Sequence, residues 1–198
     1  MNRDSHAARH GTAELRFYEE LNDFLPPDRR KRSFLHGFTG EPSVEDTLDA
    51  LGVPRALVDL VLVDGRSVGF DHRLHGGERV AVYPMFERVD ISPLLRVRRR
   101  PLRTTRFVLD ADLGALARRL RARGFDAVWR DDFDGAAIVD VSIRERRIVL
   151  TRDDALLRDP RLTHAYRLRS TEPREQLEEV VRALDLGRRR SSLAVPTE

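Results

Sequence analysis

The sequence predicts an α+β domain over residues 13–90, followed by an α/β domain with a parallel sheet over residues 106–187. Two strands, one helix and three strands succeed one another in the first half, whereas strands and helices alternate in the second. Between them lies a segment rich in proline and arginine, residues 91–105, which we expect to be a linker. With 198 residues, the chain can form one large domain or two small ones.

The first half begins with two strands. In "AELRFYEEL", Leu15 and Phe17 alternate with polar or exposed positions, as in a half-buried strand. "SFLHGF" repeats the alternation with Phe34 and Phe38. In "PSVEDTLDALGVP" we predict a helix that begins after Ser43 as its N-cap and ends before Gly52.

Three further strands follow this helix. "DLVLVDGRSVGF" contains two of them around an Asp64-Gly65 turn, and "GGERVAVYP" contains the last. The order ββαβββ resembles the ubiquitin-like, or β-grasp, fold of sulfur-carrier proteins. Those carriers expose a C-terminal Gly-Gly, but here Gly76-Gly77 precedes the last strand and the chain continues. We therefore predict a module that docks a protein partner or has a regulatory role. It is not expected to carry sulfur.

The linker is strongly basic. Six arginines lie between Arg96 and Arg106, among them the run Arg98, Arg99 and Arg100. Arginine binds phosphate bidentately and keeps its charge, so this strip could bind RNA. A solvated linker without a binding role is the alternative.

The second half contains four strands, ending near Asp110, Arg130, Thr151 and Ser170. A helix follows the first strand, with Leu113, Leu116, Ala117 and Leu120 on one face and Gly124 at its end. Thr171 is the predicted cap of the last helix. Alternation of strands and helices predicts parallel pairing through right-handed crossovers.

Acidic residues gather where three of these strands end. In open α/β sheets the ligand lies at the carboxyl ends of the strands. The clustered acids are Asp110, then Asp131, Asp132 and Asp134, then Asp153 and Asp154. Their mutual repulsion would be relieved by a divalent cation, and Mg²⁺ or Mn²⁺ prefers such oxygen ligands. The alternative is that Asp112, Asp134 and Asp153 are only helix caps.

The span from "RFVLDADLGALARRLRARGFD" to "VLTRDDALL" resembles the PIN-like ribonuclease domain of the Mut-seven C-terminal family, which is often preceded by a ubiquitin-like domain. The resemblance implies a metal-dependent ribonuclease with an acidic site. Asp110 matches the first acid and Asp153 the acid of "TRD". Asp134 is the expected middle acid, with Asp132 as its substitute. The expected metal ligands are thus Asp110, Asp132, Asp134 and Asp153.

The chain departs from that family in two places. The acidic run that usually opens the second helix is here "DDFDGAA", in which Gly135 and two alanines replace further acids. Members often end in a cysteine-rich zinc ribbon, but this sequence has no cysteine. Arg118 and Arg152 are expected to steer RNA phosphates, although Arg152 could equally pair with an acid.

Other functions were weighed against hydrolysis of RNA. A non-catalytic RNA-binding protein, or a β-grasp docking protein with a degenerate nuclease domain, is the main alternative. A receiver domain would need a lysine after its last strand, and Lys31 lies in the other half. No apolar run approaches the length of a membrane span and the N-terminus lacks a signal-peptide core, so we expect a cytoplasmic protein.

Overall fold

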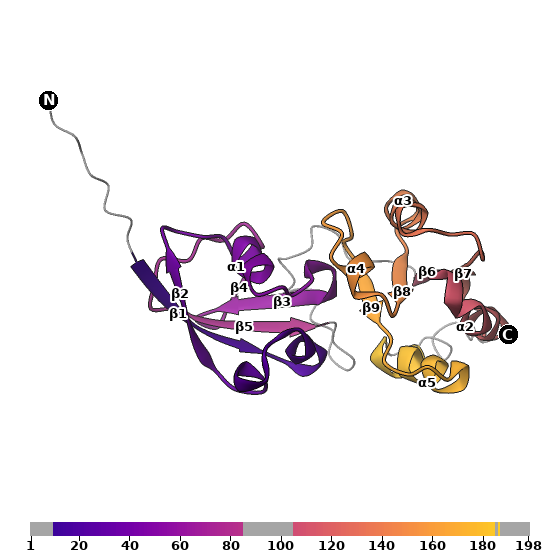
Figure 1. Cartoon of the computed structure of the whole chain (residues 1–198), viewed down its shortest axis with the longest axis horizontal. Coiled ribbons are helices and arrows are strands. Elements are labelled where there is room, and N and C mark those ends of the chain that lie inside the picture. The colour runs from indigo at the N-terminus through magenta and orange to yellow at the C-terminus, as the bar shows by residue number, and fades with distance from the viewer. Residues whose placement is uncertain (1–9, 85–104, 185, 187–198) are drawn as a thin grey trace, which may run out of the picture. The chain divides into compact units, whose positions relative to one another are not determined.

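The computed structural model describes residues 10–84, 105–184 and 186. The chain divides into two compact units, and each is considered by itself (Figure 1). The predicted linker falls outside the described residues except for its last residue, and so do Arg98, Arg99 and Arg100. No helix in the described part is long and apolar enough to cross a membrane.

The N-terminal unit is a five-stranded mixed sheet in the order β2-β1-β5-β3-β4. Strand β1 runs parallel to β5 and antiparallel to β2, which confirms the predicted β-grasp-like domain. The strands are β1 (His10–Phe17), β2 (Phe34–Thr39), β3 (Val58–Val63), β4 (Arg66–Val68) and β5 (Arg79–Pro84). Its helical elements are α1 (Val44–Ala50) and two 3-10 turns, η1 (Glu19–Phe24) and η2 (Pro27–Arg29), while a further 3-10 turn, η3 (Arg55–Leu57), precedes β3 in the chain.

Local sequence signals set the ends of these elements as expected. Ser43 caps α1 in a capping box, in which its hydroxyl accepts from Asp46 N–H and the Asp46 carboxylate accepts from Ser43 N–H. Asp64 and Gly65 both have positive φ, 48° and 78°, between β3 and β4. A tight antiparallel turn needs that conformation, and Asp-Gly is a favoured pair for it.

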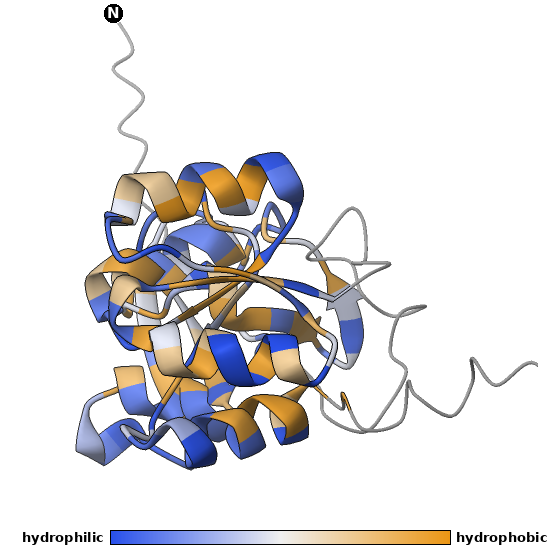
Figure 2. Ribbon diagram, turned by 90° about the vertical axis from the view of Figure 1, so that its right-hand side faces the viewer, coloured by the Kyte–Doolittle hydropathy of each residue, from blue (hydrophilic) through white to orange (hydrophobic). Residues whose placement is uncertain are grey.

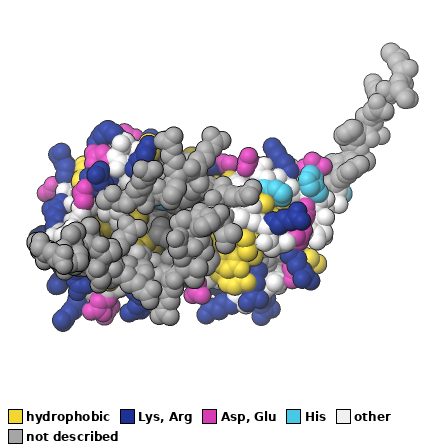
Figure 3. Space-filling model, turned by 180° about the vertical axis from the view of Figure 1, so that it is seen from behind, with side chains coloured by type: hydrophobic (Ala, Val, Ile, Leu, Met, Phe, Trp, Pro, Cys, Tyr) yellow, Lys and Arg dark blue, Asp and Glu magenta, His cyan; other side chains and the backbone are white. Residues whose placement is uncertain are grey.

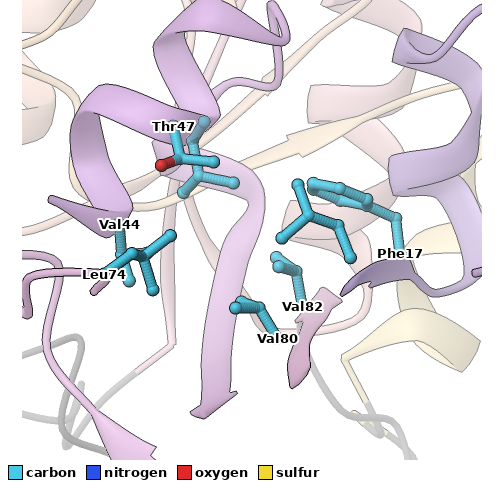
Figure 4. A pocket seen from close by; sticks show the side chains of 8 residues that line it. Phe17, Val44, Thr47, Leu74, Val80 and Val82 are labelled. Carbon is cyan, nitrogen blue, oxygen red and sulfur yellow. The ribbon is translucent and has the colours of Figure 1, made fainter. Parts of the chain in front are cut away.

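The core of this unit contains a small void between α1 and the sheet (Figure 4). Its volume is about 10 Å³, and the lining is apolar except for Thr47. The Thr47 hydroxyl already donates to Ser43 O at 2.9 Å, so nothing in the void offers a water the partners that it needs. The lining residues are Leu15, Phe17, Val44, Thr47, Leu48, Leu74, Val80 and Val82.

Truncation of Leu74 should destabilise this domain strongly. Its side chain is fully buried against the void, so Leu74→Ala would enlarge an existing cavity that the rigid sheet cannot close. We expect a loss of about 3 kcal/mol or more, in the upper part of the range for such substitutions. Urea denaturation of wild type and variant measures the loss. A cost below about 1 kcal/mol would mean that the site collapses around the smaller side chain.

The C-terminal unit is an all-parallel sheet in the order β7-β6-β8-β9, which confirms the predicted α/β architecture. Helix α3 lies on one face of the sheet, and α2 and α5 lie on the other (Figure 1). The strands are β6 (Arg106–Leu109), β7 (Asp126–Val128), β8 (Ile148–Thr151) and β9 (Ala165–Arg167). The helical elements are η4 (Ala111–Leu113), α2 (Gly114–Ala122), α3 (Gly135–Glu145), α4 (Asp154–Leu157) and α5 (Pro173–Ala183).

Strands β6 and β8 form the centre of the buried layer. Phe107, Val108, Leu109, Val149 and Leu150 are all completely buried. Helices cover both faces, so these strands are apolar without interruption rather than alternating. Figure 2 shows hydrophobic strands among helices that carry separate hydrophobic and hydrophilic stripes.

The prediction that Thr171 caps α5 is wrong. Pro173 occupies the first helical position, so the N-cap is Glu172, whose side chain makes no capping bond. Proline is favoured at that position because its missing N–H would have no helical partner. The hydroxyl of Ser170 accepts instead from Glu172 N–H at 3.1 Å.

A buried arginine joins the amino ends of three strands. The side chain of Arg147 is 7% exposed and pairs with Asp126 Oδ1 and Glu145 Oε2, both at 2.7 Å. Its Nη1 also donates to Phe107 O at 3.3 Å. The hydrogen bond from Arg147, with a second from Arg144, lowers the pKa of the Glu145 carboxyl. One guanidinium therefore ties β7, β6 and the start of β8 together.

Replacement of Arg147 by methionine should cost about 2 kcal/mol of unfolding free energy. This is less than for a fully buried pair, because Asp126 and Glu145 are 48% and 33% exposed and regain water. Arg144→Met, at an exposed position, is the control and should cost under about 0.5 kcal/mol.

The loss should also depend on pH. Glu145 has a lower pKa in the folded than in the unfolded chain, so its contribution is present above about pH 4.3 and is lost in more acidic solution. The stability gap between wild type and Arg147→Met should therefore narrow as the pH falls through that region. A gap that stays constant down to strong acid would contradict the ion-pair interpretation.

Candidate active site

The order of the parallel sheet makes a topological switch point between β6 and β8, and we call the carboxyl edge at this point the β6–β8 crevice. The chain passes from β6 to β7 on one side and then crosses to β8 on the other. The chain thus leaves β6 toward β7 and leaves β8 toward β9, on opposite sides, and ligands bind at such switch points in open α/β sheets. Leu109 and Leu150 are register partners, so Asp110 and Thr151 follow them at the same edge.

A hydrogen-bond chain crosses this crevice. Thr151 Oγ1 donates to Asp110 Oδ2 at 2.6 Å, and Asp153 N–H donates to Thr151 Oγ1 at 2.9 Å. Thr151 is completely buried, so its hydroxyl fixes Asp110 relative to the loop that carries Asp153. Sequence analysis did not single out Thr151. The available signal was a hydroxyl residue at the end of a strand that is otherwise apolar.

The three predicted catalytic acids are all helix caps. Asp110 accepts from Ala111 N–H, Asp134 from Ala137 N–H and Asp153 from Ala155 N–H, each at 2.8 Å. Capping uses one carboxylate oxygen in each case. The Oδ2 atoms of Asp134 and Asp153 receive no hydrogen bond from a described residue. Capping therefore holds these side chains in place and leaves oxygen atoms for another ligand.

The structure joins two of these acids and not the third. Thr151 links Asp110 to the backbone of Asp153, whereas Asp134 has no such link to either. Within residues 10–84, 105–184 and 186, no three or more Asp, Glu or His side chains gather closely enough to hold a metal ion.

The acidic loop before α3 distinguishes its two candidate ligands. Arg130 donates to both oxygens of Asp132, at 2.8 and 2.6 Å, and these bonds lower the pKa of that carboxyl. The Arg130 guanidinium also lies over the Phe133 ring at 5.7 Å. The negative charge of Asp132 is thus already balanced by Arg130, which leaves Asp134 as the better metal ligand of the two.

The predicted phosphate-binding arginines differ in their surroundings. Arg152 follows Thr151 and lies 3.8 Å from Asp112 in an exposed pair, as the alternative interpretation expected. Arg118 is exposed on α2 and makes no ion pair with a described residue. On the face seen in Figure 3, basic side chains are scattered among acidic ones.

Two family models match this chain in tandem. The Mut7-C ubiquitin model matches residues 10–90, and the Mut7-C RNAse domain model matches residues 105–194. The chain belongs to the Mut7-C family. Comparisons with curated proteins and with solved structures give no match. The β6–β8 crevice is therefore the carboxyl edge of a Mut7-C RNase domain.

Trp129 holds the turn that follows Asp110 in this RNase domain. Its indole N–H donates to Ala111 O at 2.9 Å. The ring lies directly on Gly114, where an added Cβ would meet it at 2.6 Å. The partly buried ring of Trp129 packs against the core of the domain. The requirement for glycine at position 114 was not predicted.

The Thr151 hydroxyl should contribute measurably to the stability of the Mut7-C RNase domain. Thr151→Val keeps the shape of the side chain but leaves Asp153 N–H without its acceptor and Asp110 Oδ2 without its donor. We expect a loss of about 1–3 kcal/mol. Thr151→Ser retains the hydroxyl and should therefore keep much of the unfolding free energy that is lost in Thr151→Val. Chemical denaturation of the three proteins tests this, and equal stabilities for the valine and serine variants would contradict it.

Proposed function

We propose that this protein is a metal-dependent ribonuclease that hydrolyses RNA phosphodiester bonds at the carboxyl edge of the β6–β8 crevice. One observation carries the proposal: in a domain of a ribonuclease family, a buried threonine orients Asp110 beside the Asp153 loop at the switch point of the sheet. RNA is the proposed partner. A protein partner for the ubiquitin-like domain and a cytoplasmic location stay predictions.

The donor set suits Mg²⁺ or Mn²⁺. Asp110 and Asp153 would hold the ion through carboxylate oxygens. Asp134, which keeps one oxygen free of hydrogen bonds from described residues, would have to move to join them, because no three acids in the described part of the chain lie close enough together to hold a metal ion. Asp132 would serve only after release from Arg130. A divalent ion bound there would supply activated water and positive charge for the transition state.

The protein's own side chains have separate tasks in this proposal. The Thr151 hydroxyl donates to Asp110 Oδ2 and so fixes the direction of that carboxylate at the carboxyl edge. Trp129 restrains the adjoining turn through Ala111 O. Arg118 and Arg152 are exposed cations on elements that begin at this edge, where they attract phosphate.

Removal of either linked acid should abolish cleavage. Single-stranded and structured RNAs are incubated with wild type, Asp110→Asn and Asp153→Asn, each with Mn²⁺ and with a chelator. We expect both variants to lose about 100-fold or more in rate, the order lost when one electrostatic group at a transition state is removed. Chelation should stop the wild type.

Asp140→Asn is the matched control for this experiment. It removes one exposed carboxylate from α3, beyond the end capped by Asp134, and should leave the rate nearly unchanged. Full activity of Asp110→Asn, or of wild type in chelator, would overturn the proposed mechanism.

The capping geometry also favours a second candidate, a non-catalytic RNA-binding or docking protein with a degenerate nuclease domain. Three acids that serve as caps need no metal to explain their positions. Calorimetric titration with Mn²⁺ separates the two candidates. Saturable binding that weakens in Asp110→Asn supports the nuclease, whereas RNA binding without metal binding supports the second candidate.

A further inference from the structure

Strand β2 is an exposed edge of the N-terminal sheet. It lies at the end of the strand order beyond β1, and none of its residues is fully buried. Leu35 is 71% exposed, the most exposed large hydrophobic side chain in the described part of the chain. Proteins usually protect such edges with charge, proline or a bulge. This strand, "FLHGFT", pairs in unbroken register with β1 and contains neither Asp, Glu, Lys, Arg nor Pro.

The backbone groups of β2 that point outward can be assigned from the ladder. Toward β5, strand β1 uses even-numbered residues, because Gly77 N–H donates to Thr12 O at 2.7 Å. Its odd-numbered residues therefore face β2, where their register partners are Phe34, His36 and Phe38. The N–H and C=O groups of Leu35 and Gly37 consequently point away from β1, toward the open edge.

We propose that β2 pairs antiparallel with β2 of a second copy of this chain, across a two-fold axis at His36. The two five-stranded sheets then become one continuous sheet. In this register, Leu35 of each copy lies opposite Gly37 of the other, so the exposed leucine side chain faces a position that has no side chain. The outward backbone groups of these two residues bond each other, which is the pairing that the ladder geometry requires.

Charge favours a second copy as the occupant. The basic residues Arg29 to Arg32 precede β2 and Glu41 follows it. Antiparallel pairing brings the basic end of β2 in one copy toward the end that Glu41 follows in the other, twice by symmetry. Burial and the nearby Arg29 charge lower the pKa of His36, so two neutral rings meet at the axis at pH 7. No like charges therefore face each other within the paired strands.

The dimer should be weak and sensitive to one residue. An edge of six residues makes a small interface. We therefore expect the dimer to have a dissociation constant between about 1 µM and 1 mM, measured by sedimentation equilibrium of the full chain. Gly37→Lys should abolish the dimer. A Cβ at Gly37 meets nothing within 4 Å, so the monomer tolerates the change. Ser67→Lys, on β4 at the opposite edge, should self-associate like wild type.

Cross-linking tests the register. The natural chain contains no cysteine, and His36 faces itself as a non-hydrogen-bonded pair with Cα atoms about 4.5 Å apart, within disulfide range. Mild oxidation should link the His36→Cys variant and leave the Thr39→Cys variant monomeric. A wild type that stays monomeric up to about 1 mM, self-association that persists in Gly37→Lys, or linking at position 39 instead of 36 would each overturn the proposal.

Discussion

The parallel pairing of β6 with β8 is the constraint on which the RNase domain depends. It places the buried apolar residues 107–109 and 148–150 side by side and brings the residues that follow the two strands to one edge. The bond from Thr151 to Asp110 forms only in that register, because the two residues lie 41 positions apart in the sequence. Asp110 also caps η4, and Asp153, whose N–H is bonded to Thr151, caps α4, so the pairing also fixes where these helical elements start.

The two edges of this sheet carry acids in opposite situations. At the amino edge, the acids Asp126 and Glu145 have a buried arginine between them, and the charges are matched within the protein. At the carboxyl edge, Asp110, Asp134 and Asp153 have backbone and hydroxyl donors, and no arginine of the described residues is among their partners. The first arrangement stabilises the fold, while the second leaves negative charge that a cation could neutralise.

Much of the fold could be predicted from local patterns. Leu113, Leu116, Ala117 and Leu120 have helical spacing and are buried as expected, and the capping box at Ser43 is a signal of neighbouring residues. Thr171 was misassigned because Pro173 moves the helix start by one residue.

The candidate site was predictable only in part. Acids after apolar strands indicated the edge, since the ends of parallel strands coincide. The threonine that orients Asp110, and the glycine that admits Trp129, depend on contacts between distant segments. A single sequence contains no local signal for such contacts. Whether an acid caps a helix or binds a ligand is likewise a matter of side-chain geometry, and here one carboxylate can do both.

The position of Trp129 gives this protein a built-in optical probe. It is the single tryptophan of the chain, and its indole N–H is bonded to the carbonyl of the residue after Asp110. All tryptophan fluorescence therefore originates beside the first acid of the crevice. Emission wavelength and quenching would follow events at that turn without any label, and signals from the ubiquitin-like domain would not mix with them.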